Sequence, residues 1–307
     1  MIVVFGSLNI DLSFPVDRLP RPGETVLGPG YLVAAGGKGL NQAVAAARAG
    51  AETRMIGCIG DDDFGRRLRA LLADEGIGAA GLRTGTQPTA CATISIDRHG
   101  QNAIVVGSGA NREARASAIP DALLAPGTTL VLQNEVPIEE TIAAARRARA
   151  RGARVVLNLA PAAALDPETL GLFDVLVVNE IEAQTLVDGF EVGRRDDPEF
   201  AIHALAGLGS QTSVLTLGAA GSYATAGGLI WRVPPLSIEA VDSVGAGDAF
   251  VGVLAARLDA GDPLSDALRR ASVAGALACL TAGAVPSMPA AAAIEARLGG
   301  LPAVRWI

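Results

Sequence analysis

Short apolar segments alternate with amphipathic ones along most of this chain, and that alternation restricts the fold more than any other feature. Runs rich in Val, Ile and Leu cover residues 2–5, 54–58, 129–133, 154–158, 175–178 and 213–217. Stretches with helical periodicity lie between most of them, at 41–49, 64–75, 139–151 and 202–208, and an Ala-rich helix is expected at 289–298. Such a pattern is typical of a parallel sheet covered by helices on both faces. We therefore predict a doubly wound α/β fold with a mostly parallel sheet.

Two regions interrupt this alternation. Residues 12–34 are rich in Pro and Gly with extended character, and residues 89–106 read as a hairpin with strands at 92–96 and 103–106. We predict one domain over residues 1–307 with a small separate β-sheet that could act as a lid, built from about 12–34 and 89–107. The alternative is a pair of ordinary hairpins at the edge of the main sheet.

Composition excludes several classes of function. A net charge of −7 without clusters of Lys or Arg makes nucleic-acid binding a poor prediction. We expect no signal peptide and no membrane span, because the first residues form a strand pattern and no apolar run is long enough. Cys58, Cys91 and Cys279 are dispersed among apolar neighbours, which indicates a reducing, cytoplasmic location. Two histidines in the whole chain argue against a His-based zinc site or a Ser-His-Asp triad.

A glycine-rich turn is the strongest candidate for chemistry. The stretch 241–250, VDSVGAGDAF, follows a strand-like run near 234–240 and precedes a helix that should end at about residue 259. Gly245 and Gly247 allow the backbone to turn sharply, and the N–H groups at the start of the helix favour a phosphate or an oxyanion. Asp248 would repel such an anion, so we interpret it as the base that takes a proton from the attacking group. An Asp that merely caps the helix is the alternative.

Two further segments carry polar side chains suited to a polyol. Asn9 and Asp11 follow the first strand and project to the same side, and an amide with a carboxylate matches hydroxyls that both donate and accept. The segment 36–43, GGKGLNQA, places Lys38 and Asn41 at the start of a helix. It lacks the Ser or Thr of a Walker A loop, so a second set of sugar contacts is the better interpretation. An ordinary turn and an empty glycine-rich helix start remain the alternatives.

Three more strand ends carry polar groups. Gln133 and Glu135 follow the third main strand and should point the same way. Asn179 and Glu182 open a helix, where they could hold the waters of Mg²⁺ or form a capping box. A glycine-rich turn at 216–221 could hold nucleotide phosphates. These groups are all expected on one rim of a parallel sheet, and that convergence carries more weight than any single motif.

Together these motifs resemble the ribokinase/PfkB family of ATP-dependent sugar kinases over nearly the whole chain. Segment 36–43 is similar to the family's N-terminal signature and segment 242–250 to its C-terminal one; Gln133-x-Glu135 and the segments 100–102 and 109–111 resemble the ribokinase branch. The resemblance implies ATP-dependent phosphorylation of the primary hydroxyl of a sugar, D-ribose before others, giving D-ribose 5-phosphate. It also implies Mg²⁺, an activating K⁺, and a homodimer formed through the lid.

The resemblance also implies roles for individual residues. Asp248 would be the base, and the anion hole would comprise Gly245, Ala246 and Gly247. The sugar would be held by Asn9, Asp11, Gly37, Lys38, Asn41 and Glu135, and covered by the lid residues Ala92, Ile94 and Val106. The nucleotide would contact Asn179, Thr216, Gly218, Gly221, Gly247 and Ser272. Glu182 would serve Mg²⁺ through water, and K⁺ would be held at Asp242, Val244, Ala278, Thr281, Gly283 and Ser287.

Three alternatives compete with this interpretation. A relative that phosphorylates fructose, ketodeoxygluconate or a nucleoside would share the mechanism, although two Trp and two Tyr offer little aromatic surface for a base. A dinucleotide-dependent oxidoreductase would need Gly-x-Gly-x-x-Gly after the first strand, where this chain has GSLNID. A catalytically inactive sugar-binding regulator would not need Asp248.

Overall fold

Ten strands form the central sheet of the computed structural model, which describes residues 1–188 and 198–306. They are β1 (Ile2–Phe5), β4 (Thr53–Ile59), β5 (Gly78–Thr84), β8 (Thr129–Leu132), β9 (Arg154–Asn158), β10 (Val175–Asn179), β11 (Thr212–Thr216), β12 (Ser222–Ala226), β13 (Leu229–Val233) and β14 (Arg305–Trp306). Their order is β14-β13-β12-β11-β10-β9-β8-β1-β4-β5. All neighbours from β11 to β5 pair in parallel, and β12 to β14 extend one edge antiparallel. The predicted mostly parallel sheet is confirmed.

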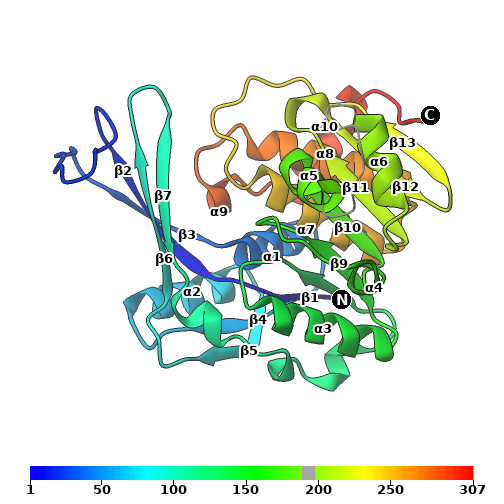
Figure 1. Ribbon diagram of the computed structural model, residues 1–307, viewed down its shortest axis with the longest axis horizontal. Helices are drawn as coiled ribbons and strands as arrows, with labels where there is room; N and C mark the ends of the chain where they lie inside the picture. Colours follow the sequence, from blue (N-terminus) through cyan, green and yellow to red (C-terminus); the bar gives the residue numbers. More distant parts are fainter. Residues whose placement is uncertain (189–197, 307) are drawn as a thin grey trace.

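Helices cover both faces of this sheet, and successive residues of β1 alternate between the two cores (Figure 1). Ile2 and Val4 belong to one core, with residues of α1 (Lys38–Arg48), α2 (Asp63–Asp74), α7 (Ala246–Asp259), α8 (Leu264–Ala278) and α10 (Ala291–Arg297). Val3 and Phe5 belong to the core on the other face, with residues of α3 (Ile138–Ala150), α4 (Pro167–Leu170), α5 (Glu180–Asp188) and α6 (Pro198–Ala206). The remaining short elements are α9 (Ala284–Ser287), η1 (Gly109–Glu113), η2 (Ala116–Ala118), η3 (Asp121–Leu124), η4 (Gly218–Ala220) and η5 (Leu298–Gly300).

The chain changes direction across the sheet between β1 and β8. From β1 it proceeds outward through β4 to β5, and it then returns to the opposite side of β1 with β8. The ends of these two strands lie very close together, because a Cβ on Gly6 would lie 1.9 Å from Oε1 of Gln133. Ligands of open α/β sheets bind at the carboxyl ends of strands beside such a reversal. The topology therefore predicts a ligand site beside Gly6, Gln133 and the residues that follow them.

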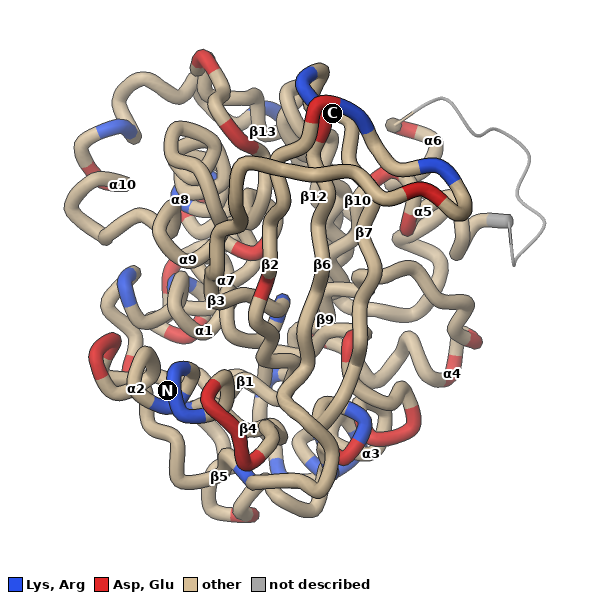
Figure 2. The backbone as a smooth tube through the Cα atoms, turned by 90° about the vertical axis from the view of Figure 1, so that its left-hand side faces the viewer, with Lys and Arg blue, Asp and Glu red and all other residues tan. Residues whose placement is uncertain are grey.

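A second, four-stranded sheet stands out from the body of the molecule at the upper left of Figure 1. Its strands are β2 (Asn9–Pro15), β3 (Leu32–Gly36), β6 (Ala90–Ile96) and β7 (Asn102–Gly107), in the order β3-β2-β6-β7. We call it the small sheet. It confirms the predicted separate sheet and excludes hairpins attached to the main one. Asp11 is the only charged residue in these four strands, which cross the face seen in Figure 2.

Sequence patterns misplaced or missed several elements. The strand-like run expected near 234–240 is wrong: β13 ends at Val233, and Pro234 and Pro235 have no N–H to continue a ladder. The expected helix at 289–298 is shorter, at Ala291–Arg297. Strands β5, β12 and β13 and helix α8 were not anticipated. Within the described ranges, no helix has the length and apolar character needed to cross a bilayer.

Candidate active site

The glycine turn leads directly into α7, as the sequence predicts. Gly245 has φ of 79° and ψ of −5°, a left-handed conformation that favours glycine, and α7 begins at the next residue. A Cβ on Gly247 would meet nothing within 4 Å, so the space in front of it is open. The N–H of Ala246 is engaged with the carbonyl of Ser243 at 3.2 Å. The N–H groups of Gly245 and Gly247 are therefore better placed than that of Ala246 to receive an anion.

Asp248 lies in the first turn of α7 and is buried, with 6% of its surface exposed. Its two carboxylate oxygens each accept a side-chain amide hydrogen bond from α1. Asn41 donates from Nδ2 to Oδ2 at 2.9 Å, and Gln42 donates from Nε2 to Oδ1, also at 2.9 Å. A buried carboxylate needs such donors, because burial without them would favour its neutral form. The structure thus brings Asn41 and Asp248 together, and it adds Gln42.

Gln42 belongs to a buried chain of amides that the sequence patterns did not reveal. Its Nε2 also donates to Oδ1 of Asn158 at 3.0 Å, and its Oε1 accepts from Nε2 of Gln133 at 2.7 Å. The Asp248 carboxylate can only accept, so Gln42 must direct its NH₂ group there and its oxygen toward Gln133. Gln133 and Glu135 were expected to point the same way; Gln133 bonds to Gln42, whereas Glu135 bonds to Ser7 and Lys38. The GGKGLNQA segment contained the signal for Gln42, which follows Asn41 directly.

Glu135 connects the first turn of α1 to the end of β1. Its Oε2 accepts from Oγ of Ser7 at 2.6 Å and from the backbone N–H of Lys38 at 2.9 Å. Ser7 in turn accepts from the N–H of Gly39 at 3.2 Å. The start of α1 is therefore anchored at Lys38 by Glu135, and about one helical turn further on it holds Asp248 through Asn41.

Asn9 has its orientation set by Asn111. The buried N–H of Leu8 donates to Oδ1 of Asn111 at 3.1 Å, so Nδ2 of Asn111 donates to Oδ1 of Asn9 at 2.7 Å. Asn9 therefore keeps its NH₂ group for other partners. Gly37, with φ of 94°, lies beside it, since a Cβ there would be 3.0 Å from the N of Asn9. Sequence reasoning missed Asn111, which stands in the 109–111 segment that resembles the ribokinase branch.

Two charged groups of this cluster have shifted pKa values. Burial, and then the negative charge of Glu135, raise the pKa of Asp11 from 3.8 to about 6. The negative charge of Asp248 raises the pKa of Lys38 against the opposing effect of burial, and Glu135 and Glu182 add to it. Lys38 thus stays protonated among three carboxylates. A Cβ on Gly36 would lie 2.1 Å from Oδ2 of Asp11, so a larger residue there would displace the Asp11 carboxylate.

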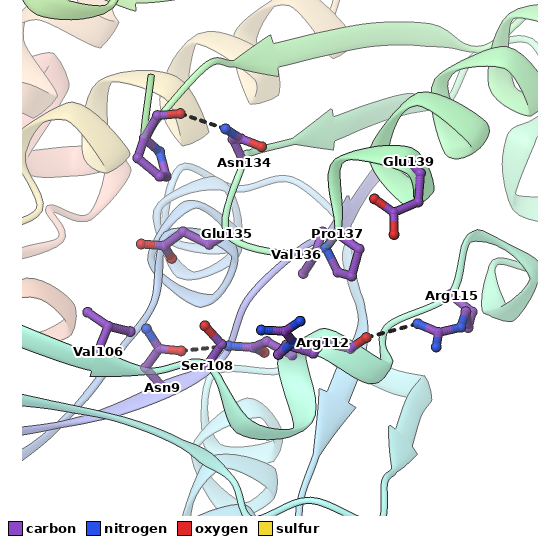
Figure 3. A pocket seen from close by; sticks show the side chains of 12 residues that line it. Asn9, Val106, Ser108, Arg112, Arg115, Asn134, Glu135, Val136, Pro137 and Glu139 are labelled. Carbon is purple, nitrogen blue, oxygen red and sulfur yellow. Dashed lines mark hydrogen bonds between the residues drawn. The ribbon is translucent and has the colours of Figure 1, made fainter. Parts of the chain in front are cut away.

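A cavity of about 530 Å³ lies beside these residues, and we call it the small-sheet cavity. Figure 3 shows Asn9, Val106 and Glu135 at one side of it and Arg115 and Glu139 at the other. Of the residues expected on the covering strands, Val106 lines it. Ala92 is buried and pairs with both Asp11 and Val106, whereas Ile94 lies two residues further along β6. The small sheet therefore brings Asn9, Asp11, Ala92 and Val106 together.

A second cavity, of about 510 Å³, lies on the other side of the glycine turn, and we call it the glycine-turn cavity. Most of the residues expected to contact a nucleotide line it, namely Thr216, Gly218, Gly221, Gly247 and Ser272. Pro235, Leu236 and Ile238, from the segment wrongly expected to be a strand, give it an apolar wall. Gly221 has φ of 93°, and a Cβ there would lie 2.3 Å from the carbonyl of Val233. A flat apolar ring with phosphates toward Gly247 would fit this space.

Asn179 and Glu182 form the reciprocal bonds of a capping box. The N–H and Nδ2 of Asn179 donate to the two oxygens of Glu182 at 2.8 and 3.1 Å, and Oδ1 of Asn179 accepts from the N–H of Glu182 at 2.9 Å. Burial raises the pKa of Glu182, and the charges of Lys38 and Asp248 also act on it. Glu182 therefore lies close enough to the cluster to feel its charges, although Asn179 does not line the glycine-turn cavity.

The two loops expected to hold a monovalent cation are joined by Asp242. Its Oδ1 accepts from the N–H of Val244 at 3.0 Å, and its Oδ2 accepts from the N–H of Gly283 at 2.9 Å. The structure thus brings three of the six expected residues together. Ala278, Thr281 and Ser287 belong to the stretch from the end of α8 to α9, and Ser287 donates from Oγ to the carbonyl of Ala284 at 2.7 Å.

Acidic, His and Cys side chains do not gather here as they would around a transition metal. Across residues 1–188 and 198–306, no group of three or more His, Cys, Asp or Glu is arranged to hold a metal ion. A cation at the Asp242 loops would therefore depend on backbone carbonyl and hydroxyl oxygens with one carboxylate. That donor set fits a large, weakly hydrated ion better than Zn²⁺.

Comparisons with known proteins agree with this geometry. The model of the pfkB family carbohydrate kinases matches residues 1–291. The ribokinase of Haemophilus influenzae is 36% identical over 291 residues, covering 94% of this chain and 95% of that protein. The mouse ribokinase is 33% identical over 296 residues, covering 94% and 91%.

Solved structures show the same relationship. A crystal structure of ribokinase from Thermotoga maritima has a TM-score of 0.90 and 34% identity, covering 97% of this chain and 99% of that one. The structure of Arabidopsis thaliana ribokinase complexed with ribose and ATP has a TM-score of 0.88 and 29% identity, covering 97% and 98%. The ribokinase fold and the family predicted from the sequence are confirmed. This chain belongs to the pfkB family of carbohydrate kinases.

Proposed function

We propose that this carbohydrate kinase transfers the terminal phosphoryl group of ATP to the 5-hydroxyl of D-ribose, and that it does so in the cytoplasm. The observation that carries the proposal is the position of Asp248. Its carboxylate lies beside the open glycine turn, which faces the glycine-turn cavity. It is also held by Asn41, one turn of α1 away from Lys38, whose N–H bonds to Glu135, and Glu135 lines the small-sheet cavity. A base between an acceptor site and a donor site is what phosphoryl transfer needs.

The residues at the turn divide the chemistry between them. Asp248 accepts the proton of the sugar hydroxyl as its oxygen attacks the phosphorus atom. The N–H groups of Gly245 and Gly247, at the positive end of α7, stabilise the negative charge on the transferring group. Ala246 joins them only if its bond to Ser243 opens. Lys38, kept protonated by the surrounding carboxylates, adds positive charge on the same side.

Recognition of the sugar rests on a matched set of donors and acceptors. Asn9 presents its NH₂ group because Asn111 occupies its oxygen, whereas Asp11 and Glu135 present carboxylate oxygens. Gly37 allows the backbone to approach Asn9 closely, and Ala92, Ile94 and Val106 cover the sugar from the small sheet. Vicinal hydroxyls that donate to one neighbour and accept from the next suit this arrangement. The Arabidopsis relative is complexed with ribose and ATP, which supports ribose as the acceptor.

ATP is assigned to the glycine-turn cavity. We place its phosphates along Thr216, Gly218, Gly221 and Gly247 and its base toward Ser272, with Asn179 on the nucleotide side. The apolar wall and the glycine-rich floor of this cavity support that orientation. The ribokinase of Cryptococcus neoformans, which is in complex with ADP, is 33% identical to this chain with a TM-score of 0.82.

Two ions complete the proposal. Mg²⁺ neutralises the phosphates in such transfers, and Glu182 with Asn179 would hold its waters. Glu182 fits that role because its pKa is raised by burial, so a nearby cation would stabilise its charged form. K⁺ would be held by Asp242, Val244, Ala278, Thr281, Gly283 and Ser287, on two loops that the Asp242 carboxylate joins.

A second copy of this chain is the proposed partner. Large apolar side chains are exposed on both faces of the small sheet: Leu32 at 70% and Ile104 at 53% on one face, and Val105 at 71% on the other. Exposed apolar side chains gathered on one small sheet indicate a candidate interaction surface. We propose that two copies form a homodimer through their small sheets.

A panel of acceptors tests the proposed function. With ATP, Mg²⁺ and K⁺ present, kcat/KM should be highest for D-ribose among D-ribose, 2-deoxyribose, D-fructose, ketodeoxygluconate and adenosine. If another acceptor has the highest kcat/KM, the proposed mechanism stands but D-ribose is not the preferred substrate. Binding of ribose without turnover of any acceptor would instead support an inactive sugar-binding regulator.

A further inference from the structure

Arg48 ends α1, the helix whose first turns hold Asp248, and it forms a fork-shaped ion pair with Glu75. Its Nε and Nη2 donate to the two carboxylate oxygens of Glu75 at 2.9 and 2.5 Å. The side chains are 27% and 17% exposed, so this pair is better shielded from water than a typical surface pair. Two parallel bonds hold a planar guanidinium in one orientation, which an ammonium group cannot reproduce.

The third nitrogen of this guanidinium holds the segment that contains α9. Nη1 donates to the carbonyl of Val285 at 3.0 Å and to that of Met288 at 2.8 Å. This helix has only four residues and follows Gly283, which has φ of 84°. A helix this short is not stable without outside contacts. Its position therefore depends on groups such as Arg48.

The segment that contains α9 also packs against the glycine turn. A Cβ on Gly245 would lie 3.0 Å from Cε of Met288 and 3.1 Å from Cα of Ala284, so the turn and the segment are in close contact. At the other end of the turn, Asp242 accepts from the N–H of Gly283 at 2.9 Å. Residues 242–245 thus contact residues 283–288. Arg48 in turn fixes residues 283–288 through its two backbone hydrogen bonds.

We propose that Arg48 is a positioning residue for phosphoryl transfer. Through its hydrogen bonds to the carbonyls of Val285 and Met288, Arg48 fixes the position of Gly245 and the conformation of the loops assigned to the monovalent cation. This inference rests on the proposed function. It adds that α1 serves the reaction at both ends, with Asn41 and Gln42 at one end and Arg48 at the other. Loss of Arg48 should impair the transfer step and cation binding, and it should leave the sugar contacts in place.

The test compares Arg48→Lys with a matched control, Arg257→Lys. Arg257 makes an equivalent fork with Asp262, at 2.8 and 2.9 Å and with side-chain exposures of 28% and 18%, at the opposite end of α7 from Gly245. Arg48→Lys should lower kcat by about tenfold and raise the K⁺ concentration for half-maximal rate by about fivefold, because small displacements at a reacting centre are costly. The KM for ribose should stay within about twofold of the unmodified protein. Arg257→Lys should change none of these values.

A measurement without turnover completes the test. Thermal unfolding in KCl and in choline chloride of equal ionic strength reports cation binding, because a ligand that binds only the folded protein raises Tm. The K⁺-specific rise should be smaller in Arg48→Lys than in Arg257→Lys. Equal kcat and equal K⁺-specific rises in the two variants would overturn the role of Arg48.

Further variants test the role of Arg48 if Arg48→Lys cannot be studied. If Arg48→Lys does not fold, Glu75→Gln retains the guanidinium but loosens its fork, and its kcat should be lower than that of Arg257→Lys; an unchanged kcat would overturn the proposal. If K⁺ does not change the rate of the unmodified kinase, the assignment of a K⁺ site in the proposed function is wrong. The kcat ratio of Arg48→Lys to Arg257→Lys still decides the role of Arg48 in that case.

Discussion

The amide nitrogen of Gln42 lies 2.9 Å from the carboxylate of Asp248, and this contact sets the direction of a buried chain of hydrogen bonds. The carboxylate accepts from Gln42, so the oxygen of Gln42 must face Gln133, which donates to it at 2.7 Å. Both glutamines are fully buried. The orientation of the proposed base is therefore supported from β8 as well as from α1, and rotation of Asp248 would leave buried amides without partners.

Removing that support should slow the reaction without affecting the sugar. Gln42→Leu deletes one of the two donors to Asp248, and a hydrogen bond to a charged group is worth enough to lower kcat by about 10- to 100-fold. Gln133→Leu leaves the contact itself but frees Gln42 to rotate, so its effect should be smaller. Steady-state kinetics with ribose and ATP would check both, and a Gln42→Leu enzyme with normal kcat would contradict the supporting role.

Asp248→Asn removes the proton acceptor and keeps the shape of the side chain. We expect kcat to fall by about 10²- to 10⁴-fold, which is the usual contribution of general base catalysis. Ribose and ATP should still bind, as calorimetry of the variant would show. Near-normal turnover would mean that another group takes the proton.

Sequence patterns were sufficient for the framework of the fold because the buried parallel strands are continuous apolar runs. Strands β1 and β9 have the expected bounds, and the small sheet follows from the hairpin pattern. Strand β5 was missed because Gly78–Thr84 contains two glycines and several exposed residues. The run at 234–240 was misread because its apolar residues line a cavity instead of a sheet.

The candidate site was predictable only where residues stand in motifs. Asp248, Asn9, Lys38 and Glu135 each follow a glycine turn or a strand end, so their spacing indicated a shared rim. The partners of these residues come from distant parts of the chain. Asn111 is separated from Asn9 by 102 positions and Asn158 from Gln42 by 116, and no local pattern encodes such contacts.

The pKa of Asp11 predicts how sugar affinity depends on pH. With a pKa of about 6, Asp11 becomes protonated as the pH falls from 7 to 5 and loses its role as a pure acceptor. The kcat/KM for ribose, which reports groups of the free enzyme, should therefore decline below about pH 6, whereas kcat should decline less. Asp11→Asn should abolish this dependence and raise KM at every pH. Asp17→Asn, at an exposed position beyond the end of β2, is the control.

The same shift has a consequence for stability. A carboxyl whose pKa is raised from 3.8 to about 6 by folding disfavours the folded state at any pH above 3.8, and fully above 6, by up to about 3 kcal/mol. Asp11→Asn should therefore raise Tm at pH 7.5 and have little effect near pH 4. A Tm that is unchanged at pH 7.5 would show that Lys38 or another group already compensates the buried charge.

Monovalent cations should change the rate in a specific order. The loops around Asp242 are assigned to K⁺, which is larger and more weakly hydrated than Na⁺, so activity at constant ionic strength should rise in KCl more than in NaCl or choline chloride. Asp242→Asn should weaken this response because it removes the negative charge and leaves one acceptor oxygen for the two N–H groups of Val244 and Gly283. Equal rates in all three salts would remove the cation from the proposal.

The apolar face of the small sheet predicts the oligomeric state. Val105 is 71% exposed in β7, so a charge at this position would be desolvated if two small sheets pack together through the face that carries it. Val105→Asp should therefore convert a dimer to a monomer in sedimentation velocity experiments. Leu229→Asp is the control, because Leu229 is an exposed apolar residue, at 48%, in β13 of the main sheet.

Dissociation by both variants would point to a different interface, and an unmodified protein that sediments as a monomer would remove the dimer from the proposal. If only Val105→Asp dissociates, its KM for ribose decides whether the partner copy also helps to hold Asp11 and Ala92 over the sugar.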